Sequence, residues 1–301
     1  MLILVTGAAG YIGSSFTRNL AQKVGRENIR AVDNFEIGTI RDLDGLRVEA
    51  ADATDERQVK QMLDGVETVV HLAAYSDIRL CEKQGKNAIL NNLYSVKLLL
   101  EEGRKQQLKR FIFPSSFAVY AGGHRVIHEG TPKKPYNFYG FLKHWAEELI
   151  VSYAERYGME YVIFRQTNVV GKGLLEKGTV MNVLCRRAKE GLPLVIYGDG
   201  KQMRNFIHLK DLLLFYERAL TENTGIYNLG GVDTKSVKDI AQEVAAAAEE
   251  IYGKKVAIEY RESIQPEVMK NEFQFDISKL VKDFRIRPQI TVKQMIRELL
   301  V

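Results

Sequence analysis

The sequence predicts an α/β protein, in which helices cover both faces of a parallel sheet and a smaller mixed α/β part follows. In the first half, short runs rich in β-branched residues alternate with longer amphipathic stretches, which is typical of parallel strands joined by helices. The short runs are apolar throughout, as expected for strands that are buried on both faces. After residue 165, glycine-containing loops separate shorter segments, and this change in the sequence pattern marks the second part.

The elements expected in the first part alternate in type along the chain. Strands are expected at residues 2–5, 29–32, 68–72, 111–113 and 161–165. Helices are expected at residues 13–24, 88–105 and 139–157, and in the second part at residues 179–190, 209–220 and 236–252. We therefore expect one domain over residues 1–165 and a substrate-binding region over residues 166–301, from which the chain can cross back to the first domain.

Composition and charge exclude several classes of protein. The 301 residues are 46% hydrophobic and 27% charged, which is ordinary for a chain with a substantial core. The net charge of +5 is small, and because no long Lys/Arg run concentrates it, nucleic acid is not expected as a partner.

The cysteines and the N-terminal segment indicate a compartment. Cys81 and Cys185 are far apart, which argues against a disulfide or a metal site and favours a reducing environment. No apolar run reaches the ~18 residues of a membrane span. The first strand follows Met1 directly, without a basic segment or a cleavage site, so we expect a cytoplasmic protein with no membrane partner.

A glycine-rich segment follows the first expected strand and opens the first expected helix. It runs Gly7-Ala8-Ala9-Gly10-Tyr11-Ile12-Gly13, with GxxGxxG spacing. Glycines permit a tight turn and let backbone N–H groups approach a pyrophosphate at the positive end of the helix. Asp33 ends the second strand, where a carboxylate can hold the adenosine ribose of NAD and repel the extra phosphate of NADP. Together these features indicate a Rossmann-type doubly wound sheet that binds NAD.

Other strand ends complete the predicted cofactor site. Asp52 follows a third strand-like stretch and can accept a hydrogen bond from the adenine amine; it can equally cap the next helix, and the sequence leaves both possibilities open. His71, at the end of the fourth strand, is interpreted as a packed strand residue rather than a catalyst. The remaining expected contacts are Asn34, Ala53, Leu72, Ala73 and Ala74.

A second motif predicts the catalytic residues. Tyr139 and Lys143 have YxxxK spacing on an expected helix, which places them on one face. A free tyrosine titrates near ~10, and a nearby ammonium favours the phenolate and lowers its pKa. The lysine can also hydrogen-bond the nicotinamide ribose. Ser115 and Ser116 follow the strand at residues 111–113, at the sheet edge where ligands bind, and a hydroxyl there can share the substrate's proton with the tyrosine.

These segments together resemble the extended short-chain dehydrogenases, the NAD-dependent epimerase/dehydratase family of nucleotide sugars, and most of all its UDP-glucose 4-epimerases. The resemblance implies that Ser116 is the catalytic hydroxyl, with Ser115 as the alternative if the register slips by one. It also implies Tyr139 as the base, Lys143 as its partner and Asn92 as a cofactor contact. The matching segments are residues 6–13, 33–34, 52, 71–74, 92, 115–120, 139–143, 165–171, 198–211, 227–230 and 276–280.

Two of these segments resemble the substrate loops of that family. Residues 165–171 resemble RxxNVYG, whose asparagine, here Asn168, contacts the nucleotide diphosphate. Residues 198–208 resemble GDGxQxRDFxH, in which Arg204 grips a phosphate with its planar fork, and Arg261 is expected to be a second clamp. Either arginine can instead be a solvated surface charge. The chain departs from the family's pattern at Pro114, Val170, Lys172 and Asn205.

The resemblance leaves several activities to compare. A 4,6-dehydratase needs an acid and a base directly after the catalytic hydroxyl, where Phe117 and Ala118 cannot transfer protons. A net reductase often uses NADPH, against which Asp33 argues. A non-catalytic NAD-binding protein has no need of the Ser-Tyr-Lys set. We therefore expect an NAD-dependent 4-epimerase of UDP-glucose and UDP-galactose, which works through a 4-keto sugar.

Two further expectations concern the sugar and the assembly. In the family, the position three residues before Asp276 forms a wall beside the sugar's 2-substituent, and the bulky Phe273 found there is expected to exclude N-acetylated sugars. Phe273 can instead point into the core, since it alternates with Phe275 as strand residues do. The family also implies a homodimer built through the helices at residues 88–105 and 139–157; the alternative is that both helices pack only within the monomer.

Overall fold

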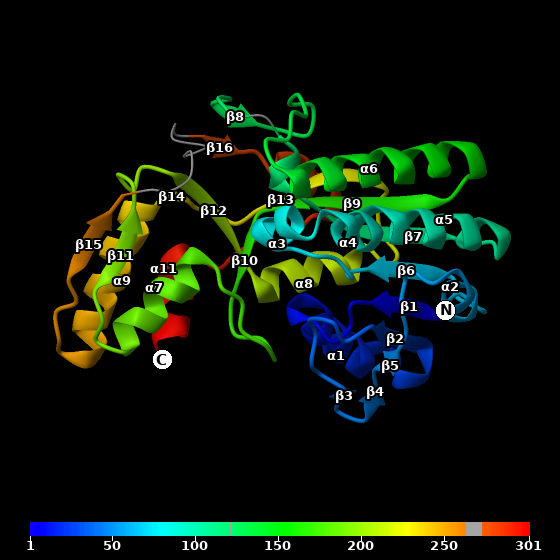
Figure 1. Cartoon of the computed structure of the whole chain (residues 1–301), viewed down its shortest axis with the longest axis horizontal. Coiled ribbons are helices and arrows are strands. Elements are labelled where there is room, and N and C mark those ends of the chain that lie inside the picture. The colour runs from blue at the N-terminus through cyan, green and yellow to red at the C-terminus, as the bar shows by residue number, and fades with distance from the viewer. Residues whose placement is uncertain (121, 263–272) are drawn as a thin grey trace.

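A seven-stranded parallel sheet is the centre of the computed structural model, which describes residues 1–120, 122–262 and 273–301 (Figure 1). Its strand order is β13-β9-β7-β6-β1-β2-β5, so the chain winds outward from β1 in one direction and then, from β6, in the other. This confirms the predicted doubly wound sheet and places its switch point between β1 and β6. The strands are β1 (Ile3–Thr6), β2 (Ile29–Asp33), β5 (Glu49–Ala50), β6 (Thr68–His71), β7 (Arg110–Ser116), β9 (Glu160–Gln166) and β13 (Gly225–Leu229).

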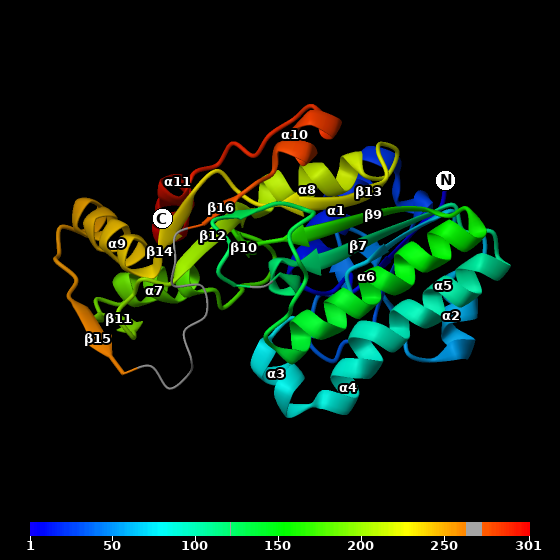
Figure 2. The same cartoon turned by 90° about the horizontal axis from the view of Figure 1, so that it is seen from above.

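The two faces of the sheet pack into two separate cores, because successive side chains of a strand point in opposite directions. Ile3 and Val5 of β1 lie in one core and Leu4 lies in the other. Figure 2 shows the helices of the two faces as layers above and below the sheet. The first core is covered by α1 (Tyr11–Val24), α8 (Leu209–Arg218) and α10 (Ser278–Phe284). The second is covered by α2 (Glu56–Met62), α5 (Ser95–Lys105) and α6 (Phe138–Tyr157).

A smaller part lies beside the carboxyl ends of the strands and has its own core (Figure 1). Its strands are β10 (Asn168–Val170), β11 (Leu194–Tyr197), β12 (Met203–His208), β14 (Thr234–Ser236) and β15 (Ile258–Arg261). Its helices are α7 (Val180–Lys189), α9 (Val237–Tyr252) and α11 (Val292–Leu300). Because β13 and α8 return to the large sheet, residues 166–301 are shared between the two parts.

The expected elements are present, and most of their ends differ by one or two residues. The largest extension is β7, which continues through Ser116 instead of ending at residue 113. The helix expected at residues 88–105 begins earlier and changes pitch, as α4 (Gly85–Ile89), a π-helical turn (Leu90–Tyr94) and α5 in succession. Such wide turns inside helices occur frequently at functional sites, and this one carries Asn92.

A buried ion pair joins α6 to the sheet. Glu147 on α6 accepts hydrogen bonds from Arg165 on β9, the shortest at 2.7 Å, and from the Ser115 hydroxyl on β7. Neither charged side chain is more than 2% exposed. The same guanidinium donates to the Tyr120 hydroxyl at 3.0 Å and to the Glu129 carbonyl at 2.8 Å. Because each charge is satisfied only in this arrangement, the contacts hold α6 in one register on the sheet.

We predict that Glu147→Ala lowers the free energy of unfolding by about 3–5 kcal/mol, because it leaves the Arg165 charge buried and unpaired. Urea unfolding followed by circular dichroism measures the loss. The matched control is Glu148→Ala, which removes an exposed pair with Lys133 and should cost at most about 1 kcal/mol. Equal losses in the two variants would contradict the role of the buried pair.

Candidate active site

A cleft of about 1370 Å³ lies at the carboxyl ends of the central strands and extends to β10 and β12 of the smaller part. It is lined by the glycine loop, by the ends of β2, β6 and β7, and by the first turns of α6. Pockets that bind drug-sized ligands measure about 300–1000 Å³. The cleft therefore has room for a dinucleotide together with a second ligand.

The glycine loop forms a cradle that side chains would fill. Gly7 has a φ of +70°, and a Cβ on it would lie 2.5 Å from the Ala73 backbone nitrogen. A Cβ on Gly13 would lie 1.9 Å from the Gly7 carbonyl oxygen. Helix α1 begins after Gly10 without a side-chain cap, which leaves its first N–H groups for an anion. These features fit the pyrophosphate of NAD.

Two carboxylates lie farther along the same wall. Asp33, which is 8% exposed, accepts hydrogen bonds from the backbone N–H groups of Ala9 at 3.0 Å and Phe35 at 2.8 Å. Burial raises the pKa of Asp33, and these two hydrogen bonds oppose that effect. Asp52 also lines the cleft, whereas Asp55 caps α2. The possibility that Asp52 caps this helix is therefore wrong, and its place on the wall favours contact with the cofactor.

Most of the other predicted cofactor residues line the cleft, and Asn92 does not. The Asn92 side chain accepts a hydrogen bond from the Tyr75 N–H at 2.7 Å and donates to the Tyr75 carbonyl at 2.9 Å. Because Tyr75 lines the cleft, Asn92 supports the wall from behind. The predicted residues on the wall itself are Gly7, Gly10, Tyr11, Ile12, Gly13, Asp33, Asn34, Asp52, Ala53, Leu72, Ala73, Ala74, Tyr139 and Lys143.

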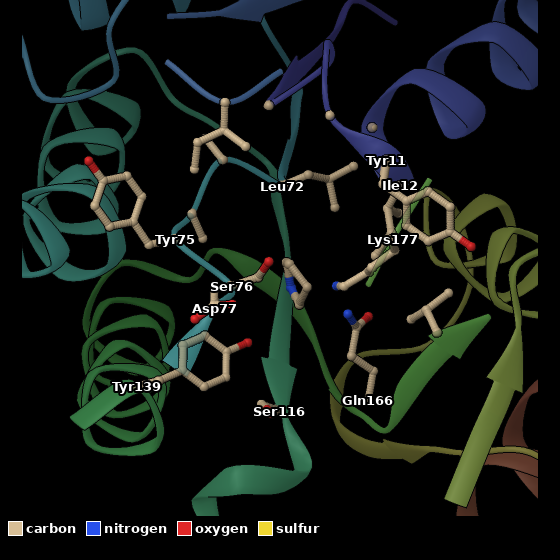
Figure 3. A pocket seen from close by; sticks show the side chains of 18 of the residues that line it. Tyr11, Ile12, Leu72, Tyr75, Ser76, Asp77, Ser116, Tyr139, Gln166 and Lys177 are labelled. Atoms are coloured by element: carbon tan, nitrogen blue, oxygen red, sulfur yellow. The ribbon is translucent and has the colours of Figure 1, made fainter. Parts of the chain in front are cut away.

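The two serines at the end of β7 face opposite sides. Ser115 is fully buried and donates to Glu147, whereas Ser116 lines the cleft and accepts a hydrogen bond from the Ala118 N–H at 3.1 Å. This follows from the alternation of side chains along a strand. Figure 3 shows Ser116 and Tyr139 beside the same space. The geometry supports Ser116, and not Ser115, as the hydroxyl partner of Tyr139.

Burial disfavours the charged form of both remaining members of the set. It raises the pKa of Tyr139 to about 12, which a hydrogen bond with Ser116 only partly opposes. It lowers the pKa of Lys143 to about 7, and the lysine Nζ lies 5.9 Å from the centre of the Tyr139 ring. Lys143 does not contribute to the shift of the Tyr139 pKa, which burial dominates. NAD, when bound, supplies the hydride acceptor and a positive charge that favours the phenolate.

The predicted substrate residues are divided between the cleft and the surface. Asn168, Arg204 and Phe273 line the cleft from the smaller part's side. Arg261 lies on the exposed strand β15, where it pairs with Glu259 at 3.1 Å, and it is not part of the cleft wall. Its predicted role as a second phosphate clamp has no support in this arrangement.

Sequence reasoning missed several polar residues that line the cleft. Gln166 at the end of β9, Asp77 before α3 (Ile78–Lys83) and Lys177 between β10 and α7 all face it (Figure 3). None belongs to a local motif with a recognisable chemistry. Only the folding of three distant segments around one space brings them together.

Other sequence interpretations can be checked in the same region. His71 is packed as predicted, within hydrogen-bonding distance of Thr6 at 2.7 Å and Ser95 at 3.2 Å, and burial lowers its pKa to about 3. Cys81 and Cys185 are both buried free thiols. In the described ranges, no three His, Cys, Asp or Glu side chains are grouped as a metal site would need. Across residues 1–120, 122–262 and 273–301, no helix is both long and apolar enough to cross a membrane.

Comparison with known proteins defines the class. Residues 3–230 match the model of the NAD dependent epimerase/dehydratase family. Since the match covers well over half of the chain, the protein belongs to this family, and NAD is its cofactor.

Individual relatives narrow the comparison. The structure is similar to UDP-glucose 4-epimerase of Thermus thermophilus in complex with NAD, at 25% identity and a TM-score of 0.85, with 100% of this chain and 98% of the other covered. It has the fold of UDP-glucose 4-epimerase of Thermotoga maritima with UDP-glucose, at 24% identity and a TM-score of 0.89, with 100% and 97% covered. An uncharacterised UDP-glucose epimerase of Bacillus subtilis is 28% identical over 309 aligned positions, covering 97% of this chain and 95% of the relative.

We predict that NAD binds at least about tenfold more tightly than NADP, because the Asp33 carboxylate would meet the extra phosphate as a like charge. Titration of the protein with each dinucleotide measures the difference. Asp33→Ser should reduce the difference in affinity between NAD and NADP. Equal affinities in the unmodified protein would remove Asp33 from the ribose site.

We predict that Tyr139→Phe binds NAD normally but turns over a nucleotide sugar at least ~100-fold more slowly, because the acid–base hydroxyl is lost. Ser116→Ala should also lose activity, and more than its neighbour Ser115→Ala, which serves as the matched control. Steady-state rates with circular dichroism as a folding check give the comparison. A greater loss in Ser115→Ala would show that the catalytic register is off by one.

Proposed function

We propose that the protein interconverts UDP-glucose and UDP-galactose by epimerisation at carbon 4, through a transient 4-keto sugar. The pairing of Ser116 and Tyr139 in the cleft, beside the cofactor cradle, is the observation that carries the proposal. Tyr139 takes the proton of the 4-hydroxyl group, Ser116 hydrogen-bonds the same oxygen, and Lys143 holds the nicotinamide ribose. The ketone then turns over in the cleft and is reduced on its other face, while the redox chemistry is the cofactor's.

The side chains that follow Ser116 disfavour a dehydratase. Phe117 stacks on Phe273 with ring centres 5.2 Å apart, and Ala118 is buried, so neither position can move a proton. Asp33 at the ribose position disfavours a reductase that uses NADPH. Epimerisation needs neither an additional acid nor exchange of the cofactor, and the residues of the cleft suffice for it.

The smaller part supplies the grip on the nucleotide diphosphate. Arg204 on β12 and Asn168 on β10 line the cleft from the smaller part. A guanidinium with its planar fork suits two phosphate oxygens, and an amide donates to a third. Such contacts hold the nucleotide in place while the sugar turns over.

The position of Phe273 supports its proposed role as a wall beside the sugar. It packs in a small core with Phe275, Val119 and Tyr120, and its ring also forms part of the cleft wall. With only 7% of its surface exposed and Phe117 stacked against it, the ring is held in place. A rigid aromatic wall supports a preference for sugars without an N-acetyl group.

We predict that the protein converts UDP-galactose with a kcat/KM ~10- to 200-fold above that for UDP-N-acetylgalactosamine, because the wall rejects the larger group by steric cost alone. Phe273→Ala should reduce this preference. The assay incubates both variants with a panel of UDP-, GDP- and dTDP-sugars, including UDP-glucuronic acid, and separates the products. Absence of 4-epimerisation with every member of the panel would refute the proposed function. Equal kcat/KM values for UDP-galactose and UDP-N-acetylgalactosamine would refute the role of Phe273 as a wall.

We also propose a cytoplasmic homodimer that pairs the α5 and α6 helices of two copies. Apolar side chains are exposed along these helices. Ile89 is 43% exposed on α4, which leads into α5 through the π-helical turn, and Phe141 and Trp145 on α6 are 39% and 46% exposed. The two aromatic rings lie 5.9 Å apart, one turn from each other, and form a patch that a second copy would cover.

We predict that Trp145→Glu shifts the protein from dimer to monomer, because a charge in the centre of a small interface is costly to desolvate. Sedimentation velocity measures the change, with Tyr260→Glu as a control at an exposed aromatic on β15. Since Trp145 is the only tryptophan in the sequence, its fluorescence also reports dissociation of the unmodified dimer when the protein is diluted. A monomer in the unmodified protein, or a dimer in Trp145→Glu, would contradict this interface.

A further inference from the structure

A lysine that the proposed reaction does not use reaches into the cleft. Lys177 belongs to the β10–α7 loop, residues 171–179, and Figure 3 shows its side chain pointing into the space beside Gln166 and below Ile12. It is partly buried, and within the described ranges it has no hydrogen-bond or ion-pair partner. A cation in a cleft without a partner is expected where an anionic ligand supplies one.

The loop that carries Lys177 is fastened to the helix that opens the cofactor site. The Tyr11 hydroxyl, in the first turn of α1, donates to the Gly171 carbonyl at 2.8 Å. A Cβ on Gly173 would lie 2.9 Å from the Tyr11 ring and 3.2 Å from the Ser15 hydroxyl oxygen, so the loop rests on α1. At its far end, Thr179 caps α7. The start and the end of the loop are thus both held, with Lys177 between them.

Among the described residues, the one carboxylate that favours the charge of Lys177 already has other partners. This carboxylate is Asp77, which caps α3 and lies 3.6 Å from Arg79. Lys143 stands on another wall, and the positive charge of Lys177 contributes to lowering its pKa. Burial lowers the pKa of Lys177 in spite of Asp77. The other carboxylates on the cleft wall are Asp33, Glu36, Asp52 and Glu176.

We propose that Lys177 binds the pyrophosphate of NAD and thereby fastens the β10–α7 loop over the cofactor. The pyrophosphate is the anion that the glycine loop and the uncapped end of α1 would hold, and the β10–α7 loop rests on that same first turn. Backbone N–H groups supply no net charge, whereas the ammonium does. The contact slows release of the dinucleotide. This inference rests on the NAD dependence of the family and is independent of the sugar.

The test follows release of the reduced cofactor from the loaded protein. Bound NADH is displaced by excess NAD, and the decay of its fluorescence gives the release rate. Lys177→Met, which keeps the length and removes the charge, should release NADH about tenfold faster, the scale of one hydrogen bond to a charged group. Lys177→Arg keeps the charge, so it should release NADH at a rate within about threefold of that of the unmodified protein. The matched control is Lys172→Met, an exposed lysine of the same loop, which should not change the rate.

Ligands that differ in the pyrophosphate identify the group that is bound. Lys177→Met should weaken ADP-ribose, which contains the pyrophosphate, and leave adenosine unaffected. Unchanged NADH release with a raised KM for the nucleotide sugar would overturn the proposal and assign Lys177 to an anionic group of the substrate. Equal effects of Lys172→Met and Lys177→Met would overturn it as well, since only the loop's general charge would then matter. The NADH release rates and the binding of ADP-ribose and adenosine do not depend on which sugar the protein converts.

Discussion

The buried pair of Glu147 and Arg165 is the contact on which the geometry of the cleft depends. Glu147 lies one turn after Lys143, so the face of α6 that carries the proposed catalytic residues also carries the anchoring carboxylate. Ser115 donates to that carboxylate from the strand end next to Ser116. The Glu147 carboxylate therefore fixes the position of α6 relative to the end of β7. Because successive side chains of a strand point in opposite directions, Ser116 then faces the cleft.

Burial of the residues around the cleft also shifts the pKa values of the side chains that line it. Burial raises the pKa of Tyr139 and lowers that of Lys143, because both shifts disfavour the charged form. Lys177, on the opposite wall, is affected in the same way. Burial therefore opposes the charged forms of all three side chains. A dinucleotide supplies both a cationic ring and an anionic pyrophosphate, so cofactor binding and the protonation of these side chains are coupled.

The smaller part completes the cleft because the chain crosses back to the large sheet. Strands β10, β11 and β12 of the smaller part come first along the chain, and strand β13 then pairs with β9 in the large sheet. The Asn228 amide on β13 donates to the carbonyls of Ile127 and Asp276, at 3.2 and 3.0 Å, and so ties the loop before α6 to the segment after Phe273. The aromatic wall and the catalytic helix are in this way held to one strand.

Local signals in the sequence were sufficient to predict the sheet, and they selected Gly7, Gly10, Gly13, Ser116, Tyr139 and Lys143, which line one cleft. The glycine spacing, Asp33 and the YxxxK pair act through contacts within one strand–helix unit or one helical turn, where spacing alone determines geometry. The tertiary structure alone decided that Asn92 supports the wall from behind, that Arg261 lies outside the cleft, and that Lys177 reaches into it. Those placements depend on how segments far apart in the chain pack together, and no periodicity or motif within a segment encodes that packing.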